Sequence, residues 1–530
     1  MNKISAYITD FFRSFWPALL SGLLLFLSFP KIDLYPLAWV SLVPLLVSLY
    51  GAERRQALSS GFIFGIVYFF STTYWIYHSI HHYGSIPFIP SLVIVLLLCL
   101  CLSVYTALFS LLFSQTIART NLPALIVAPA FWTTLEFVRS YAFTGFPWSS
   151  LGYSQHAFLP MIQIADITGI YGISFLIVSF NGAIADAFLL RRRMADRPLF
   201  SRLPTLSGFA VLAAVLLFSL AYGMARLMDE QPGATVKVSL IQGNIEQDMK
   251  WNPSYQKQVF SVYRDLTRTA VMNDTPDLVI WPETALPFVF MADRKLTEDF
   301  LAFQRQMNAY LLFGSILESR PNGDDTSGDK KSTYTNSAVL LTRDGKVSYI
   351  YDKIHLVPFG EYVPLRSLLF FIDKLVYGIG DYVPGESHTR AITPFGSFGV
   401  HICYEIIFPG LVRKSYPHGG DFIVTVTNDA WFGRTNGPYQ HFSMAVFRAV
   451  ENRKPVVRAA NSGISGFIDS RGRIVKTIGL FERTFLSGEI HTNKTLTVYT
   501  KYGDIFSYFC ILCSLFMIMG SRQRKAPSGG

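Results

Sequence analysis

Charged residues are scarce in this sequence. Only 15% of its 530 residues are Asp, Glu, Lys or Arg, and 51% are hydrophobic, whereas a soluble globular domain carries about 25% charged residues. An ordinary soluble protein is therefore not expected. The uncharged residues gather in long runs near both ends of the chain, and a helix of about 20 apolar residues crosses the hydrocarbon core of a bilayer. Much of the chain is thus expected to lie in lipid.

Cysteine is also scarce. Four of the five cysteines lie within apolar runs, where cysteine packs as a small hydrophobic residue: Cys99, Cys101, Cys510 and Cys513. Their spacings lack further metal ligands nearby, so a metal or redox site is not indicated. Cys403 stands alone outside these runs with no nearby disulfide partner, which fits a thiol kept free for chemistry. The sequence has no metal or nucleotide motif, and we predict no cofactor.

The net charge of +10 indicates either a nucleic-acid partner or the basic cytoplasmic loops of a membrane protein. The densest basic cluster lies between two apolar segments and has no interleaved aromatic residues, unlike a nucleic-acid surface. It consists of Arg191, Arg192, Arg193, Arg197 and Arg202. The membrane explanation is therefore preferred, and no nucleic-acid partner is expected.

Eight segments are apolar enough to be candidate spans: 14–30, 34–50, 57–77, 88–113, 122–138, 166–188, 204–226 and 505–521. We expect a seven-helix membrane region over 1–230 and a final helix with a cytoplasmic tail over 496–530. The first span resembles a signal peptide but lacks a small-x-small cleavage site, so we expect it to be retained. Basic residues lie mainly in alternate connections, whereas loops 78–87 and 141–163 contain no Lys or Arg. This asymmetry predicts that both termini are cytoplasmic and that 227–503 is extracytoplasmic.

The region 231–495 is charged and rich in turns, and we expect it to form one domain. Strand-like runs occur at 236–242, 277–281, 310–317, 337–341, 347–351, 398–402, 421–427, 456–460 and 466–469. Helix-length stretches lie at 253–272, 293–307 and 440–453, hairpin turns at 343–346 and 470–473, and a mobile surface loop is expected at 319–332. Strands that alternate with helices indicate a layered α/β sandwich.

Three reactive side chains each follow an apolar strand: Glu283, Lys353 and Cys403. Strand ends in α/β sheets gather at a crevice, so the three side chains can meet in one pocket. A carboxylate can remove the thiol proton, the thiolate can attack a carbonyl carbon, and the ammonium can stabilise the oxyanion, with the Tyr404 N–H as a second donor. Taken singly, the residues also fit a surface carboxylate, a solvated lysine and a core thiol.

Three strings resemble the Glu, Lys and Cys motifs of the nitrilase superfamily. They are Trp-Pro-Glu-Thr at 281–284, the string 352–361 that continues through Glu-Tyr-Val-Pro to 364, and Ile-Cys-Tyr-Glu at 402–405. A nitrilase-like domain between seven spans and one resembles the bacterial apolipoprotein N-acyltransferase family over essentially the whole chain. The resemblance implies an α-helical membrane bundle of about eight helices in the inner membrane, with a nitrilase-like αββα sandwich on its extracytoplasmic face.

The resemblance also implies an enzyme that works in two steps. Cys403 would take an acyl chain from a phospholipid, typically phosphatidylethanolamine, as a thioester. The amine of the S-diacylglyceryl cysteine at the N-terminus of an apolipoprotein would then take the acyl chain. Glu283 would be the general base and Lys353 the oxyanion stabiliser. By the same resemblance, further residues support, line or gate the site: Glu361, Glu405, Tyr404, Trp251 and Trp431.

The stretch 364–379 is unusually apolar for an extramembrane loop. We expect it to form an arm that touches the membrane and covers the substrate entrance, with Phe370 and Phe371 among its lipid contacts. A buried helix of the sandwich is the alternative for this stretch.

Two other functions share parts of the pattern. A membrane-tethered amidase or esterase would use the same three residues with water as the acceptor, but a tether needs only one span. A non-enzymatic scaffold or transporter would make the three residues dispensable. The three histidines at 78, 81 and 82 could bind a metal, but their position in a short interfacial loop does not favour ligation.

Overall fold

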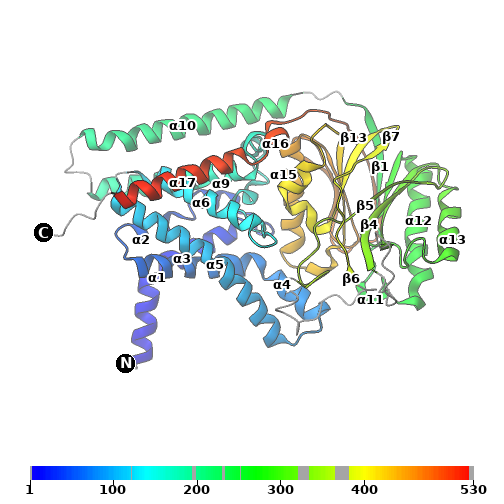
Figure 1. The fold of residues 1–530 in the computed structure, drawn as a ribbon, viewed down its shortest axis with the longest axis horizontal. Helices are drawn as coiled ribbons and strands as arrows, with labels where there is room; N and C mark the ends of the chain where they lie inside the picture. The colour runs from blue at the N-terminus through cyan, green and yellow to red at the C-terminus, as the bar shows by residue number, and fades with distance from the viewer. Residues whose placement is uncertain are drawn as a thin grey trace, which may run out of the picture. The chain divides into compact units, whose positions relative to one another are not determined.

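The computed structural model describes residues 3–120, 122–193, 199–229, 233–250, 252–319, 333–363 and 381–523. The chain divides into two compact units (Figure 1). The helical unit comprises Met1–Tyr77, Pro87–Met228 and Tyr502–Gly530, and the α/β unit comprises His78–Ile86 and Asp229–Lys501.

The apolar runs form the long helices of the helical unit. These are α1 (Lys3–Leu27), α3 (Arg54–Thr73), α5 (Phe88–Arg119), α6 (Ala124–Tyr141), α9 (Ile170–Arg193), α10 (Leu199–Met228) and α17 (Ile505–Gln523). Short helices connect them: η1 (Tyr35–Trp39), α2 (Val43–Leu49), α4 (Trp75–His78), η3 (Leu151–Gln155), α7 (Leu159–Ile162) and α8 (Ala165–Thr168).

Four stretches within the described residues are long and apolar enough to cross a membrane: Phe88–Arg119, Ile170–Leu189, Thr205–Met228 and Ile505–Gln523. The bent pair Arg54–Thr73 and Trp75–Tyr83 would make a fifth span. The count of eight spans therefore stays a prediction. The segment 34–50 is not one continuous helix, because η1 and α2 each begin afresh at a proline, which cannot extend a preceding helix.

Small residues let α3 and α5 pack closely. A Cβ placed on Gly61 would lie 2.4 Å from the Thr106 carbonyl oxygen, and one on Gly65 would lie 2.8 Å from the Cα of Ser103. The two glycines are four residues apart, so they lie on the same face of α3. Such small-residue faces are typical of packed membrane helices.

Two β-sheets form the centre of the α/β unit (Figure 1). The first has the order β13 (Thr484–His491), β1 (Thr235–Gln242), β2 (Leu278–Ile280), β3 (Tyr310–Ser319), β4 (Thr333–Leu341) and β5 (Val347–Asp352), and β6 (Asp381–Tyr382) also pairs with β4. The second has the order β12 (Ile474–Ile478), β11 (Ser465–Ile468), β10 (Val456–Ala460), β9 (Phe422–Thr427), β8 (Gly396–Ile402) and β7 (Ala391–Thr393).

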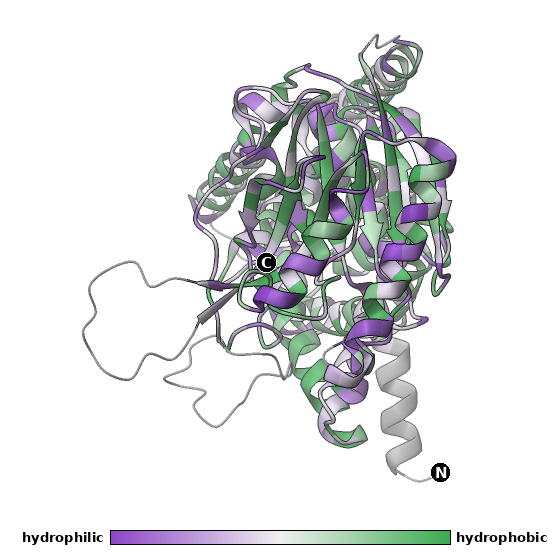
Figure 2. Cartoon of the chain, turned by 90° about the vertical axis from the view of Figure 1, so that its right-hand side faces the viewer, coloured by the Kyte–Doolittle hydropathy of each residue, from purple (hydrophilic) through white to green (hydrophobic). Residues whose placement is uncertain are grey.

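Helices cover the outer faces of the sheets. α12 (Gln256–Asp274) and α13 (Arg294–Gln304) lie outside the first sheet, and α15 (Gly437–Asn452) lies outside the second (Figure 1). Seen from the side of α12 and α13, hydrophilic segments lie on these outer helices, while the strands behind them are mainly hydrophobic (Figure 2). Shorter helices complete the unit: η2 (Ser79–Tyr83), α11 (Gln247–Lys250), η4 (Pro253–Tyr255), η5 (Cys403–Ile407), α14 (Pro409–Lys414), η6 (Asp429–Phe432) and α16 (Val498–Tyr502), which ends in the helical unit.

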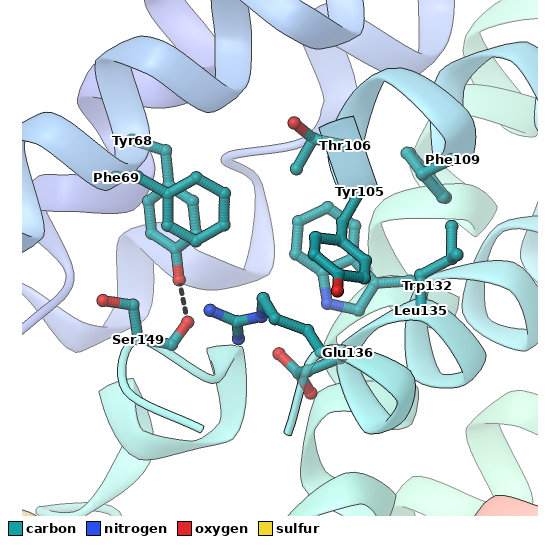
Figure 3. Close-up of a pocket in the computed structure, with 10 residues that line it drawn as sticks. Tyr68, Phe69, Tyr105, Thr106, Phe109, Trp132, Leu135, Glu136 and Ser149 are labelled. Atoms are coloured by element: carbon teal, nitrogen blue, oxygen red, sulfur yellow. Dashed lines mark hydrogen bonds between the residues drawn. The ribbon is translucent and has the colours of Figure 1, made fainter. Parts of the chain in front are cut away.

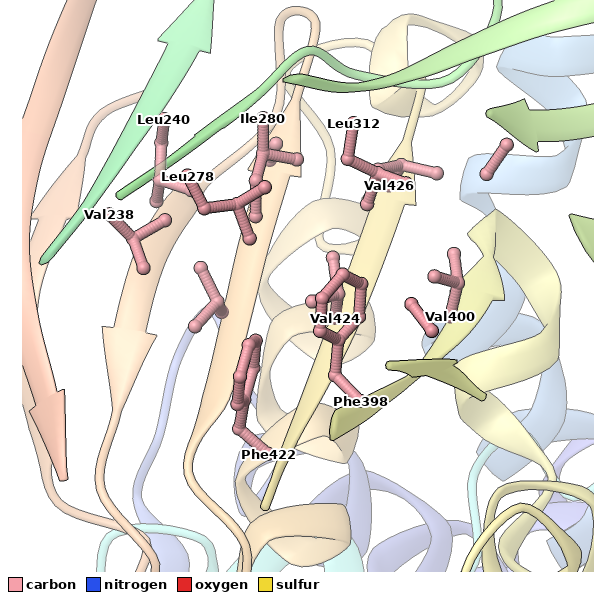
Figure 4. Packing of buried hydrophobic residues seen from close by; sticks show 14 of the residues in the cluster. Val238, Leu240, Leu278, Ile280, Leu312, Phe398, Val400, Phe422, Val424 and Val426 are labelled. Atoms are coloured by element: carbon pink, nitrogen blue, oxygen red, sulfur yellow. The ribbon is translucent and has the colours of Figure 1, made fainter. Parts of the chain in front are cut away.

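Apolar side chains fill the space between the sheets. Val238, Leu240 and Ile280 from the first sheet share a buried cluster with Phe398 and Val424 from the second (Figure 4). A second cluster joins the outer face of the first sheet to α12 and α13. Burial of apolar surface of this kind is the main driving force for folding. The predicted layered α/β sandwich is confirmed.

All nine strand-like runs of the sequence lie in strands, and both predicted hairpin turns connect antiparallel neighbours, β4 with β5 and β11 with β12. Four strands were not predicted from the sequence. β6 and β7 have two or three residues, while β12 and β13 are largely exposed or half-buried and lack an apolar run. Most of the predicted loop 319–332 and all of the predicted arm 364–379 lie outside the described residues.

Candidate active site

The three predicted reactive residues meet in the α/β unit. Each follows the strand that the sequence indicated: Glu283 follows β2, Lys353 follows β5 and Cys403 follows β8. The Lys353 ammonium lies 3.4 Å from Oε1 of Glu283. Both side chains act electrostatically on the Cys403 thiol. All three residues are buried, with exposed fractions of 1% to 8%.

Cys403 has an unusual backbone conformation. Its φ of 52° lies in the left-handed region, which non-glycine residues rarely adopt and which is common at functional sites. Burial raises the pKa of the thiol, and the negative charge of Glu283 raises it further, while Lys353 opposes the shift. This environment therefore favours the protonated thiol over the thiolate.

Both carboxylate oxygens of Glu283 are held by donors. The side-chain amide of Asn336 donates to Oε1 at 2.8 Å, and the backbone N–H of Asn428 donates to Oε2 at 2.9 Å. The ammonium of Lys250 donates to the backbone oxygen of Glu283 at 2.9 Å. These contacts fix the carboxylate in one orientation, which suits a general base.

Lys353 forms a second ion pair with Glu361. Its Nζ lies 2.9 Å from Oε2 and 3.0 Å from Oε1 of Glu361. Burial acts to lower the pKa of Lys353, but the charges of Glu361, Glu283 and Cys403 outweigh burial and raise it. Glu361 is itself fixed by donors, the Val357 N–H at 2.8 Å and the Asn336 amide at 2.8 Å. The lysine is thus a cation with a fixed position.

Glu405 links the ends of β5 and β8. Its carboxylate accepts from the backbone N–H groups of Ile402 and Ile354, both at 2.7 Å, and from the Tyr351 hydroxyl at 2.9 Å. Burial raises the pKa of Glu405 to about 7, although these backbone donors and Lys353 oppose the shift. Glu405 was predicted to support the site. In the structure it joins the ends of the two strands that precede Lys353 and Cys403.

Of the aromatic residues predicted at the site, the structure describes Tyr404 and Trp431. The ring of Tyr404 packs edge-on against Phe408, with centroids 5.1 Å apart. Trp431 is half-buried in η6. Three predicted substrate contacts lie outside the described residues: Trp251, Phe370 and Phe371.

The segment His78–Ile86, which connects apolar helices, groups with the α/β unit. The Ser79 hydroxyl donates to the Trp431 carbonyl oxygen at 2.7 Å, and the Tyr83 hydroxyl donates to the Ala430 carbonyl oxygen at 3.0 Å. The Tyr83 ring lies edge-on to the Trp431 ring at 4.7 Å. Two hydrogen bonds and one ring contact therefore connect this segment to η6.

Sequence reasoning missed several buried polar residues beside the site. Asn336, Asn428 and Lys250 contact Glu283 directly, and burial lowers the pKa of Lys250 to about 8 against the opposing charges of Glu283 and Cys403. A signal was available for Asn428, because it follows β9 as directly as Cys403 follows β8. Asn336 lies one residue before the predicted strand 337–341, inside the longer strand β4, and gave no comparable signal.

A separate pocket lies among the helices of the helical unit (Figure 3). Its lining includes Tyr105, Phe109 and Trp132 together with the buried pair Glu136 and Arg139. Glu136 accepts from the backbone N–H of Leu151 at 2.7 Å, and Arg139 donates to the carbonyl oxygen of Trp148 at 2.7 Å. Glu136 and Arg139 thus bind the backbone of the segment that follows α6. Within the described ranges, no group of three His, Cys, Asp or Glu side chains is arranged to hold a metal ion.

In comparisons with known proteins, two parts of the chain match two different families. Residues 21–183 match the family described as apolipoprotein N-acyltransferase N-terminal domain, and residues 237–497 match the carbon-nitrogen hydrolase family. A protein from Geobacter metallireducens named apolipoprotein N-acyltransferase is 42% identical, over 97% of this chain and 96% of its own. Proteins of the same name from Pasteurella multocida and Vibrio vulnificus are each 33% identical, over 95% of this chain and 94% and 96% of their own. This similarity extends over nearly the full length, and the chain belongs to the apolipoprotein N-acyltransferase family.

Proposed function

We propose that Cys403 carries the acyl group in an N-acyltransferase reaction that completes the maturation of apolipoproteins. Membership of the family supports the overall reaction. The observation that supports the site is the buried cluster in which Glu283 and Lys353, 3.4 Å apart, both act on the Cys403 thiol.

In the first step, Glu283 removes the thiol proton and the sulfur attacks the ester carbonyl of a phospholipid. The Lys353 ammonium and the Tyr404 N–H stabilise the oxyanion of the tetrahedral intermediate. The ester C–O bond then breaks, and the departing lysophospholipid oxygen takes the proton from Glu283. The products are a Cys403 thioester and a lysophospholipid.

In the second step, the α-amine of a diacylated N-terminal cysteine attacks the thioester carbonyl. Glu283 accepts a proton from the amine and returns it to the departing sulfur, so the thiol is regenerated and an amide is formed. A thioester suits this transfer because the thiol is a better leaving group than the alcohol of the donor ester.

The donor, the acceptor and the location of the reaction are part of the same proposal. Phosphatidylethanolamine is the proposed donor, and S-diacylglyceryl cysteine the proposed acceptor. The distribution of Lys and Arg supports a multi-pass protein of the bacterial inner membrane, with cytoplasmic termini and an extracytoplasmic α/β unit. The proposed arm 364–379 would admit lipid chains to the site, and the apolar character of that stretch supports its role.

Intact-mass spectrometry after exposure to phospholipid tests the acyl-enzyme. The wild-type protein should gain one fatty-acyl mass that hydroxylamine removes, and Cys403→Ala should gain none. An active enzyme without the adduct, or an equal adduct on Cys403→Ala, would overturn the assignment of the nucleophile.

A further inference from the structure

His441 contacts the nucleophile from the side of the second sheet. It lies on α15, its side chain is fully buried, and its Nε2 lies 3.1 Å from the carbonyl oxygen of Cys403. A carbonyl oxygen only accepts hydrogen bonds. Nε2 must therefore carry a proton, and this N–H donates a hydrogen bond to the Cys403 carbonyl oxygen.

A buried network holds the other ring nitrogen of His441. Nδ1 lies 3.0 Å from the Arg458 guanidinium and 3.0 Å from a carboxylate oxygen of Asp429. Asp429 also accepts from Arg458 at 2.7 Å and from the Thr427 hydroxyl at 2.8 Å. Thr427 in turn acts to lower the pKa of the Cys403 thiol. The network therefore reaches both the backbone and the sulfur of the nucleophile.

Burial, together with the neighbouring Arg458, favours the neutral form of His441. Burial lowers its pKa most, Arg458 lowers it further, and Asp429 opposes both. In the neutral ring, with the proton on Nε2, Nδ1 is an acceptor and pairs with the Arg458 guanidinium. The contact of Arg458 with Nδ1 thus leaves Nε2 as the nitrogen that donates to the Cys403 carbonyl oxygen.

The Cys403 carbonyl and the Tyr404 N–H belong to the same peptide unit. A trans peptide is planar, and its C=O and N–H point in opposite directions. A donor that fixes the carbonyl oxygen on the α15 side therefore fixes the N–H toward the other side. That N–H is the second oxyanion donor in the reaction proposed above, so its direction governs stabilisation of the tetrahedral intermediate.

We propose that His441 is a positioning residue that orients the Cys403–Tyr404 peptide, so that the Tyr404 N–H points at the developing oxyanion. Arg458, which is itself paired with Asp429, donates to Nδ1 and so leaves the ring proton on Nε2. The role rests on the proposed acyl transfer through Cys403, and it concerns the rate of that step rather than the binding of lipid.

Two amide substitutions separate this role from simple core packing. In His441→Gln, the amide nitrogen reaches the position of Nε2 and can still donate to the Cys403 carbonyl. In His441→Asn, the shorter side chain reaches only the position of Nδ1, so it can contact Arg458 but not Cys403. Both variants replace a buried imidazole by a buried amide. His401→Gln is the matched control, since His401 is fully buried on β8 and its ring nitrogens form no hydrogen bond within the described residues.

Rapid-quench acylation by phospholipid, followed by intact mass, measures the step directly in the full-length protein. We expect His441→Asn to acylate about 100-fold more slowly at saturating lipid, the range for loss of one oxyanion donor, with the half-saturating lipid concentration unchanged. His441→Gln should stay within about tenfold of wild type, and His401→Gln within about twofold. The acyl-enzyme amplitude counts the folded active sites in each sample.

The outcomes distinguish two failures. If wild type forms no acyl-enzyme, the proposed function itself fails. If wild type acylates but the Asn and Gln variants at position 441 acylate at equal rates per active site, the positioning role is wrong while the acyl-enzyme stands. Equal loss in His401→Gln would likewise assign the effect to core packing and overturn the role of His441.

Discussion

Lys353 and Glu361 form a buried ion pair, with Nζ and Oε2 2.9 Å apart. The pair helps to keep the lysine charged, because the carboxylates of Glu361 and Glu283 raise a lysine pKa that burial alone would lower. Removing one partner of a buried pair leaves an uncompensated charge, which is more damaging than loss of an exposed salt bridge.

The substitution Glu361→Gln should therefore change the pH profile as well as the rate. A lysine that needs its proton to stabilise an oxyanion loses activity as the pH rises through its pKa. Without the Glu361 charge this pKa falls, so the alkaline limb of kcat/KM should move to lower pH, and the rate at neutral pH should drop about tenfold or more. Profiles of wild type and variant that superimpose after scaling would argue against a charge-holding role.

The Cys403 thiol should remain protonated in the resting enzyme. Burial and Glu283 raise its pKa, so the thiolate fraction stays small throughout the range in which a free cysteine, with a pKa of about 8.5, would titrate. The difference in thiolate ultraviolet absorbance between wild type and Cys403→Ala should be flat from about pH 6 to 9. A titration step with a midpoint below neutrality would instead indicate a resting thiolate–lysine ion pair.

The segment His78–Ile86 should stabilise the loop that carries Trp431. Tyr83→Phe removes the hydroxyl that donates to the Ala430 carbonyl, a loss of about 1 kcal/mol for one hydrogen bond. Backbone hydrogen exchange across residues 429–433 should accelerate in this variant, while exchange in the strands of the sandwich is unchanged.

Tyr141→Phe is the control for this substitution, because its hydroxyl donates to Asp504 within the helical unit. It should leave exchange at 429–433 as in wild type. The same exchange rates in Tyr83→Phe and wild type would show that the segment does not hold this loop.

The proposed arm 364–379 should matter for lipid substrates alone. Replacement of Phe370 and Phe371 by Ser removes two large apolar side chains from this stretch, and burial of one aromatic side chain contributes about 1.5–3 kcal/mol. Turnover of long-chain phospholipid should fall about tenfold or more, whereas turnover of a soluble short-chain ester should change little. Equal losses on both substrates would contradict a lipid-contacting arm.

The sequence predicted that Glu283, Lys353 and Cys403 come together, because each lies at or just after the end of a recognisable strand. Glu283 and Cys403 follow apolar runs whose ends a sheet brings to one edge. Among the partners that hold the cluster, Asn428 also follows a strand, whereas others carry no such signal. His441 lies within an amphipathic helix, and its contact with Cys403 spans 38 residues of sequence, so only the packing of α15 against the second sheet reveals it.

The long apolar helices were predictable from hydropathy only in part. Hydropathy identified the long helices α5, α9, α10 and α17, whereas the run 34–50 is broken by Pro36 and Pro44 at the starts of η1 and α2. The segment His78–Ile86 groups with the α/β unit, where the Ser79 and Tyr83 hydroxyls donate to backbone carbonyls. Hydropathy does not register contacts of that kind.

A chase of isolated acyl-enzyme with a diacylated lipopeptide is the most direct test of acyl transfer through Cys403. The wild-type protein is loaded with phospholipid, freed of excess donor and mixed with the lipopeptide or with buffer alone. The account predicts that the lipopeptide gains the fatty-acyl mass at its α-amine as Cys403 loses it, while the thioester persists in buffer. Release of free fatty acid at the same rate with and without lipopeptide, and no acylated peptide, would contradict transfer and indicate a hydrolase.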